Sequence, residues 1–196
     1  MKMNKNLWRL TLITLLSLLI IPTFDHPLFA QEDENPSDIS ELIHNKKAPE
    51  FSLKSLDAET ISLRDYKGKI LVVHIATTWC PFCNAEAPHL EKLYQDYKDK
   101  NVEVLIIDVK EPKELVEKQL KEKHNLSFPI LLDPEGEVAA SFAPKDVLPD
   151  LSRDEVMLAS NIIIDEEGKI QFMSLLDTRN FDAELVELKK RLNEIL

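Results

Sequence analysis

The feature that most constrains this chain is a buried-strand pattern that leads directly into a pair of cysteines. Residues 70–76 form an apolar run rich in β-branched side chains, which is typical of a central strand covered on both faces. Soon afterwards comes Cys80-Pro81-Phe82-Cys83, which holds the only two cysteines of the 196-residue chain. The fold must therefore bring one central strand to the point where both sulfurs lie.

A helix is predicted to begin at this cysteine pair. Pro81 suits the first turn of a helix, because that turn does not use the N–H that proline lacks. Apolar residues then recur at helical spacing as far as Tyr97. This pattern places Cys80 at the N-terminus of the helix and Cys83 one turn further inside.

Strand and helix patterns alternate along the remainder of the chain. Further strand patterns occur at 102–109, 128–132, 161–164 and 169–175. Further helical patterns occur at 113–124, 137–142 and 181–196. Residues 48–53 and 60–63 alternate apolar and polar side chains, which predicts a small N-terminal β-hairpin extension. We therefore predict an α/β fold of three layers, with a central mixed sheet flanked by helices.

Residues 1–30 resemble a targeting segment. Basic residues precede an apolar run at 10–21, which is short for a membrane span of roughly 20 residues. Pro22 ends the run, and residues 28–30 resemble a small-residue cleavage site. We expect an exported, periplasmic or extracytoplasmic protein whose signal peptide is removed. The alternative is an uncleaved anchor that keeps the protein on the membrane.

The mature chain is predicted to consist of a tether and one domain. Residues 31–47 are polar and acidic, which indicates a flexible tether, and residues 48–196 make up the domain. The formal net charge is −11, which argues against nucleic acid as a partner, because nucleic-acid binding relies on cationic contacts to phosphate.

The cysteine pair is better suited to redox chemistry than to cross-linking. A bond between Cys80 and Cys83 closes a small ring and adds little chain-entropy stabilisation. A dithiol exchanger needs one acidic, exposed thiol that attacks and a second that resolves the mixed disulfide. Free N–H groups and the helix dipole stabilise a thiolate at a helix N-terminus. We therefore expect Cys80 to attack and Cys83 to resolve, with the Cys80–Cys83 disulfide in place of any cofactor.

A metal site is the main chemical alternative. Structural zinc takes four ligands, whereas this pair supplies two, and the five histidines are scattered. Haem attachment would need histidine after Cys83, where Asn84 stands. We expect no metal; two buried thiols that only pack remain as a further alternative.

The run at 78–88, Thr-Trp-Cys-Pro-Phe-Cys-Asn-Ala-Glu-Ala-Pro, resembles the active site of the thioredoxin-like superfamily. The most similar branch is the exported TlpA/ResA-like thiol-disulfide oxidoreductases, which are related to the redoxin or AhpC/TSA group. The resemblance extends to the runs at 48–53, 63–69, 104–108 and 162–170. It implies a thioredoxin-like fold and exchange of disulfides with client proteins, apocytochrome c among them. It also implies a membrane thiol-disulfide electron donor upstream, and favours a reductant or isomerase role.

The resemblance also suggests which residues surround the dithiol. Trp79, together with Pro81 and Phe82, is expected to dock the client; the alternative for Trp79 is core packing. Glu86 lies three positions after Cys83, on the same helical face, where its carboxylate could transfer a proton. The alternative for Glu86 is an ordinary solvated carboxylate.

His74 lies on the predicted central strand, six positions before Cys80. Thioredoxins often have a buried acid at this place, and the TlpA/ResA-like branch often has asparagine. Histidine titrates near neutral pH, so His74 is a candidate proton acceptor for Cys83. The alternative is a buried histidine whose ring is satisfied by the backbone.

Ala159 departs from the family pattern. Thioredoxin-like proteins usually place a cis-proline opposite the dithiol, and counting back from Asp165 puts that position at Ala159. A cis bond before a non-proline residue costs about 2.5–4 kcal/mol, so the Leu158–Ala159 bond is expected to be trans. Client docking is expected to change accordingly.

Two other functions remain open on the sequence. A peroxiredoxin-like peroxidase with antioxidant activity typically has Pro-x-x-x-Thr/Ser-x-x-Cys; Thr77 fits the hydroxyl position, but Val73 stands in place of proline. A non-catalytic thioredoxin-like binding domain is the other alternative, and Ala159 is its main support.

Overall fold

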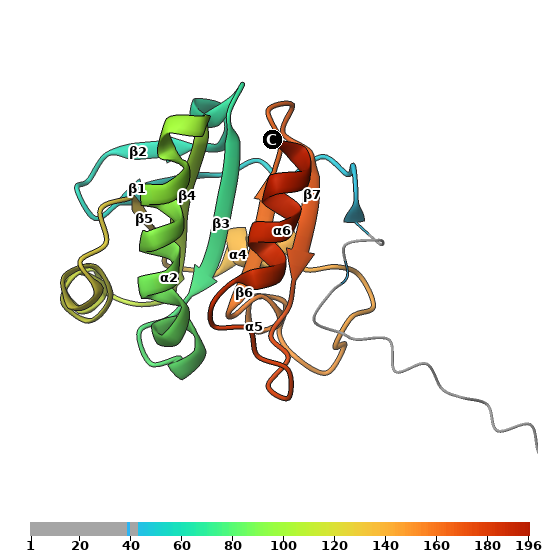
Figure 1. Ribbon diagram of the computed structural model, residues 1–196. Coiled ribbons are helices and arrows are strands. Elements are labelled where there is room, and N and C mark those ends of the chain that lie inside the picture. The colour runs from blue at the N-terminus through green and yellow to red at the C-terminus, as the bar shows by residue number, and fades with distance from the viewer. Residues whose placement is uncertain (1–38, 40–42) are drawn as a thin grey trace, which may run out of the picture. The chain divides into compact units, whose positions relative to one another are not determined.

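The computed structural model describes residue 39 and residues 43–196, and these form a mixed α/β unit (Figure 1). The predicted signal segment 1–30 and most of the predicted tether 31–47 lie outside the described residues. Within the described part of the chain, no helix is long and apolar enough to cross a membrane.

One seven-stranded sheet forms the middle layer, with strand order β2-β1-β5-β4-β3-β6-β7 (Figure 1). The strands are β1 (Ser52–Ser55), β2 (Thr60–Ser62), β3 (Ile70–Ala76), β4 (Val102–Val109), β5 (Ile130–Asp133), β6 (Ser160–Ile164) and β7 (Ile170–Ser174). β3 pairs with β4 in parallel and with β6 antiparallel. β1 and β2 pair with each other and join the sheet through β5.

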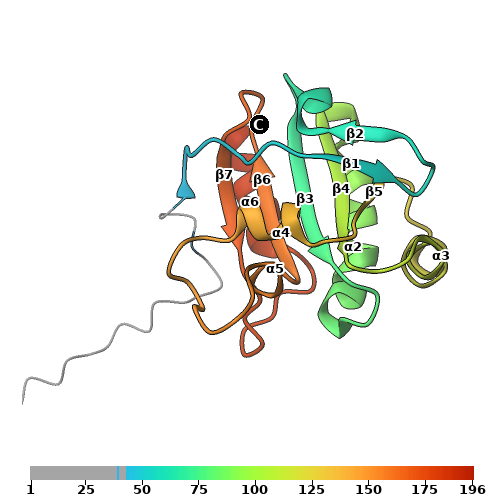
Figure 2. The ribbon, with the colours of Figure 1, turned by 180° about the vertical axis from the view of Figure 1, so that it is seen from behind.

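Helices cover both faces of this sheet. The longer ones are α2 (Pro81–Tyr97) and α6 (Val186–Ile195), which lie on the same face (Figures 1 and 2). The shorter segments are η1 (Leu63–Tyr66), η2 (Lys98–Lys100), α3 (Lys113–Val116), η3 (Glu117–Glu122), α4 (Glu137–Phe142) and α5 (Arg153–Val156). Buried residues of α4 and α5 belong to the hydrophobic cluster on the opposite face. The predicted three-layer α/β fold is confirmed.

β3 is the centre of the molecule because both of its faces are covered. All seven of its residues are buried. Val72 and Ala76 belong to the cluster beneath α2 and α6, whereas Val73 and Ile75 belong to the other cluster. An apolar run without alternation is therefore what this position requires.

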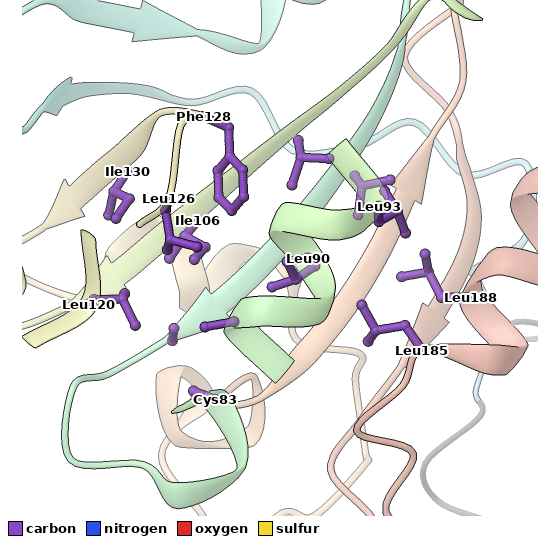
Figure 3. Packing of buried hydrophobic residues seen from close by; sticks show 14 of the residues in the cluster. Cys83, Leu90, Leu93, Ile106, Leu120, Leu126, Phe128, Ile130, Leu185 and Leu188 are labelled. Carbon is purple, nitrogen blue, oxygen red and sulfur yellow. The ribbon is translucent and has the colours of Figure 1, made fainter. Parts of the chain in front are cut away.

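The α2 face of the core holds the dithiol helix firmly against the sheet. Leu90 and Leu93 of α2 pack in the same cluster as Leu188 of α6 and Ile106 of β4 (Figure 3). Each fully buried leucine contributes about 1.5–3 kcal/mol relative to an exposed one. Cys83 belongs to this cluster as well, at the end of the helix nearest the β3 terminus.

The C-terminal helix begins later than predicted. We expected it from residue 181, but α6 starts at Val186, after Leu185 in the left-handed conformation with φ 57°. The aromatic ring of Phe181 instead packs edge-on against Phe82, with 4.8 Å between ring centroids. The segment before α6 is thus held by tertiary contact with the dithiol helix. Local helical periodicity could not anticipate this.

The predicted helix at 113–124 is present but irregular. α3 runs directly into η3, whose hydrogen bonds follow the π pattern. Val116 and Leu120 are fully buried against the α2 side of the core. The apolar side expected for this helix, Leu115, Val116 and Leu120, is therefore confirmed at Val116 and Leu120 but not at Leu115, which is 38% exposed.

Candidate active site

Cys80 stands at the junction between β3 and α2. It is the N-cap residue of α2, and its Sγ accepts a hydrogen bond from the Cys83 N–H at 3.3 Å. The pKa of Cys80 is lowered to about 6, mainly by the hydrogen bond from the Cys83 side chain, with further help from the backbone N–H groups of Cys83 and Phe82. Burial opposes this shift. The Cys80 thiol is thus ionised at neutral pH.

Cys83 has the opposite character. Its side chain is completely buried. The pKa of Cys83 is raised above its ordinary value by the hydrogen bond it makes to Cys80, by burial, and by the negative charge that Cys80 carries. One thiol of the pair is therefore ready as a nucleophile while the other retains its proton.

Cys80 is more enclosed than the sequence led us to expect. Only 4% of its surface is exposed. Its sulfur is reached through a groove of about 270 Å³. The groove is lined by Trp79, Cys80, Pro81, Phe82, Leu148, Leu151, Glu155, Val156, Leu158 and Leu176. Residues of the segment 148–158 therefore form one side of the groove above the thiol.

Trp79 is 68% exposed, so core packing is the wrong interpretation of this residue. It lines the groove together with Pro81 and Phe82. The structure thus brings three of the four predicted docking residues to the opening above Cys80. Ala159, the fourth, lines a separate cavity of about 330 Å³ that also reaches Glu86.

A buried polar network lies behind the dithiol. Glu86 is only 3% exposed, so the interpretation of Glu86 as a solvated carboxylate is wrong. Asn161 on β6 donates a hydrogen bond through Nδ2 to Glu86 Oε1 at 2.8 Å. His74 Nδ1 lies 3.0 Å from the Asn161 side-chain oxygen and 3.7 Å from Glu86 Oε2. Because an amide oxygen only accepts hydrogen bonds, His74 carries its proton on Nδ1.

Burial keeps both ionisable members of this network neutral at pH 7. It raises the pKa of Glu86 to about 8, with the Cys80 charge adding to the shift and the Asn161 hydrogen bond opposing it. It lowers the pKa of His74 to about 4. An uncharged pair avoids the high cost of placing separated charges in the interior. His74 contacts Asn161 directly, so its ring is not satisfied by the backbone alone.

Ala159 connects the end of α5 to β6 in a left-handed conformation, with φ 57°. Its N–H donates to the Ile75 carbonyl at 2.8 Å. Every peptide bond among the described residues is trans, which confirms the expectation for Leu158–Ala159. Ala159 packs in the same hydrophobic cluster as Cys80 and Cys83, although no proline is present to shape the loop.

The profile of the AhpC/TSA family matches residues 44–173, which include β1 to β6 and the whole dithiol helix. The chain belongs to the AhpC/TSA family. Among curated relatives, thiol-disulfide oxidoreductase ResA of Halalkalibacterium halodurans is 32% identical over 171 residues, covering 87% of this chain and 86% of the relative. ResA of Bacillus cereus is 29% identical over 170 residues, with 87% of both chains covered.

Solved structures of disulfide oxidoreductases share the fold. A secreted Mycobacterium tuberculosis disulfide oxidoreductase homologous to Escherichia coli DsbE superposes with a TM-score of 0.58 at 23% identity, covering 74% of this chain and 95% of the other. The thioredoxin domain of a Bacteroides vulgatus thiol-disulfide oxidoreductase gives 0.56 at 24% identity, covering 75% and 96%. These structures show a thioredoxin-like fold, and the relatives named thiol-disulfide oxidoreductase ResA identify the chain as a thiol-disulfide oxidoreductase.

Asn161 is the network residue that sequence reasoning missed. It joins His74 and Glu86, which lie 87 and 75 positions away in the sequence. The only signal was a polar residue at the start of an otherwise apolar strand. The pairing of His74 with Asn161 depends on the register between β3 and β6, and the sequence does not state that register.

The described residues hold no group of three or more histidine, cysteine, aspartate or glutamate side chains placed to bind a metal ion.

Proposed function

We propose that this family member is an exported enzyme that exchanges disulfides with client proteins, with Cys80 attacking and Cys83 resolving. The opposite acidity of the two thiols carries this proposal. Cys80 is a thiolate at a helix N-terminus, where dipole and N–H groups stabilise it. Cys83 stays protonated one turn inside. The order of attack follows, because only the thiolate is nucleophilic.

The exchange proceeds in two balanced steps. Cys80 Sγ attacks one sulfur of the client disulfide, the client S–S bond breaks, and the departing client thiolate takes a proton. Cys83 then loses its proton and attacks Cys80 Sγ, which releases the second client thiol. The client gains two electrons and the Cys80–Cys83 pair becomes a disulfide. A membrane thiol-disulfide donor returns the electrons.

Glu86 is the proposed acceptor of the Cys83 proton. At neutral pH it is mostly protonated, because its pKa is about 8. The Cys80 negative charge contributes to that raised pKa. When Cys80 enters the mixed disulfide its charge disappears, so the pKa of Glu86 falls and the carboxylate becomes available when Cys83 must ionise. Asn161 holds the carboxyl group in place throughout.

His74 is proposed to act through Glu86. Its Nδ1 contacts Asn161 and approaches Glu86, and its low pKa of about 4 keeps the ring uncharged. An uncharged ring next to Glu86 leaves the proton on the carboxyl group in the resting enzyme. In this arrangement His74 supports the proton acceptor and is not itself the acceptor.

The groove above Cys80 is the proposed docking site for clients, apocytochrome c among them. Apolar side chains from Trp79 and Phe82 meet Leu148 and Leu151 of the facing segment. The N–H of Ala159 is already bonded to Ile75 and that of Leu158 to Glu155. The facing loop therefore has few backbone donors for a client strand, and recognition rests on side chains. An extracytoplasmic location fits the predicted signal peptide.

One experiment tests the proposal. The reduced protein is mixed with a disulfide-bonded client and, separately, with hydrogen peroxide, and thiol loss is followed. We expect rapid client reduction that is abolished in Cys80→Ser, and a stable mixed disulfide with Cys83→Ser. Equal client reduction by Cys80→Ser would refute the assignment. Selective peroxide consumption would instead support the peroxidase alternative.

A further inference from the structure

A second polar cluster lies on the other side of the loop that carries Cys80. β3 and β4 run parallel and end at the same edge, with Ala76 opposite Asp108. Residues 77–79 connect β3 to Cys80, and Glu111 follows shortly after β4. The sheet therefore places an acidic segment beside the active-site loop. This segment has no role in the chemistry described above.

Glu111 holds the loop at a single residue, Thr78. One carboxylate oxygen of Glu111 accepts the Thr78 N–H, and the other accepts the Thr78 hydroxyl at 2.7 Å. Both oxygens of a half-buried carboxylate are therefore used on one residue, two positions before the attacking cysteine. Hydrogen bonds to an ionised acceptor are roughly twice as strong as neutral ones.

Asn84 of α2 holds the same loop from the opposite side. Its Nδ2 donates to the carbonyl oxygens of Thr78 and Cys80, both at 2.8 Å. Its side-chain oxygen accepts from Lys123 at 2.7 Å and from the His124 ring at 3.1 Å. The amide is thus fixed by the segment after η3. Together, Glu111 and Asn84 engage the N–H, the hydroxyl and the carbonyl of Thr78.

Asp108 completes the cluster. Its side chain is fully buried. Burial, then the negative charge of Glu111 and a hydrogen bond to the Glu111 side chain raise the pKa of Asp108 to about 8. Asp108 is therefore mostly neutral at pH 7, and Glu111 is the residue of the cluster that meets the Thr78 donors.

We propose that Glu111 is a positioning residue for the attacking thiol: it fixes the backbone at Thr78 so that Cys80 Sγ stays at the N-terminus of α2. The proposal rests on the assignment of Cys80 as the attacking thiol. Loss of the Glu111 carboxylate leaves the Thr78 N–H without its acceptor and releases one side of the loop. Cys80 Sγ then leaves the reach of the Cys83 N–H, and its thiolate loses stabilisation.

The test compares Glu111→Ala and Glu111→Gln with the matched control Glu114→Gln, which removes the same charge from an exposed position on α3. The rate at which iodoacetamide alkylates Cys80 is measured against pH in the reduced, full-length protein. We expect Glu111→Ala to move the midpoint upward by about one pH unit, which is a tenfold lower thiolate fraction below the midpoint. Glu111→Gln, which retains an acceptor oxygen, should shift it less, and Glu114→Gln should match the wild type.

The same variants are assayed with a small aromatic disulfide, whose reaction needs no client docking. We expect Glu111→Ala to react about fivefold more slowly at pH 6, because a midpoint moved from about 6 to about 7 lowers the thiolate fraction from about one half to about one tenth. If Glu111→Ala is folded and its alkylation profile equals that of the wild type, the positioning role is wrong. If Glu111→Ala does not fold, the variants Thr78→Val and Glu111→Gln replace it. An upward shift of the Cys80 alkylation midpoint in both variants supports the positioning role of Glu111, and an unchanged midpoint in both overturns it.

Failure of the proposed function has a different signature. A wild-type protein that alkylates at low pH but reduces no disulfide would refute the exchange function. The comparison of Cys80 midpoints between variants would still stand on its own, because alkylation requires neither a client nor a disulfide bond with Cys83.

Discussion

Replacing Glu86 with glutamine should make the protein more stable and slower at the same time. Glutamine keeps an oxygen that can accept the 2.8 Å hydrogen bond from Asn161, but it cannot ionise. The wild-type carboxyl group has a pKa of about 8 in the folded protein, against an ordinary value of 4.5. Folding therefore requires Glu86 to hold a proton that the unfolded chain releases.

The sign and size of the stability effect follow from that difference. Below pH 4.5 the carboxyl group is protonated in both states and costs nothing. As pH rises from 4.5 to 8, folding becomes less favourable by about 1.4 kcal/mol per pH unit. Above pH 8 the cost stays constant. At pH 7 the cost is about 3 kcal/mol, an upper value because the protein relaxes around a buried charge. Glu86→Gln removes this cost.

Denaturant unfolding of the reduced protein at pH 5, 6 and 7 measures the difference. The stability gap between Glu86→Gln and the wild type should widen with pH, from about 1 kcal/mol or less to about 3 kcal/mol. The exposed substitution Glu114→Gln serves as a control and should show no such trend. A gap that is the same at every pH would refute the claim that Glu86 is protonated in the folded protein.

The kinetic half of the prediction concerns the resolving step. A positioned proton acceptor typically contributes 10²–10⁴-fold, so release of the mixed disulfide should slow by about a hundredfold in Glu86→Gln, whereas attack by Cys80 should not slow. Quench-flow with a disulfide client separates the two steps. Unchanged release would show that the Cys83 proton goes elsewhere.

Three further predictions follow from the site. Alkylation of Cys80 should titrate near pH 6 with Cys83 unreactive, as measured by mass spectrometry of the labelled protein; modification of Cys83 first would contradict the assignment. Because burial lowers the pKa of His74 to about 4, His74 should contribute a loss of about 3 kcal/mol as pH falls from 6.5 to 4, since the unfolded chain takes up a proton there first, and this loss offsets the opposite contribution of Glu86. In denaturant unfolding, the stability of His74→Asn relative to the wild type should therefore rise by about 3 kcal/mol over that range; a difference that does not change with pH would exclude this role of His74. Leu151→Ser should raise KM for a protein client several-fold with little change toward a small disulfide, because it removes an apolar wall of the groove; equal effects on both substrates would argue against side-chain docking.

The fold was predictable where one segment carries its own burial pattern. The strands at 70–76 and 102–109 and the helix at 137–142 lie where the periodicity places them. The start of α6 was not predictable, because the contact of Phe181 with Phe82 overrides local helical preference. Such a contact joins segments far apart in the sequence, and no local pattern encodes it.

The burial of individual site residues could not be predicted from the local sequence pattern either. The exposed fraction of each side chain decided between the two interpretations of Trp79 and of Glu86. Trp79 is turned outward, whereas Glu86 is buried although charged residues are normally solvated. Both lie on or next to α2, and the sequence left two interpretations open for each. The packing of β6 beside α2 settles the case of Glu86, because Asn161 of β6 bonds to its carboxyl group in the interior.

The amino-acid sequence by itself determined the local setting of the dithiol. A buried strand precedes it, Cys80 caps the helix that follows, and Cys83 lies in the first turn of that helix. These are local properties, since helix capping and strand burial are carried by adjacent residues. Tertiary structure alone decided what surrounds the sulfurs. Asn161 meets Glu86 across 75 positions, and Glu111 meets Thr78 across 33. Those contacts depend on strand order and register, which arise from the packing of the whole sheet.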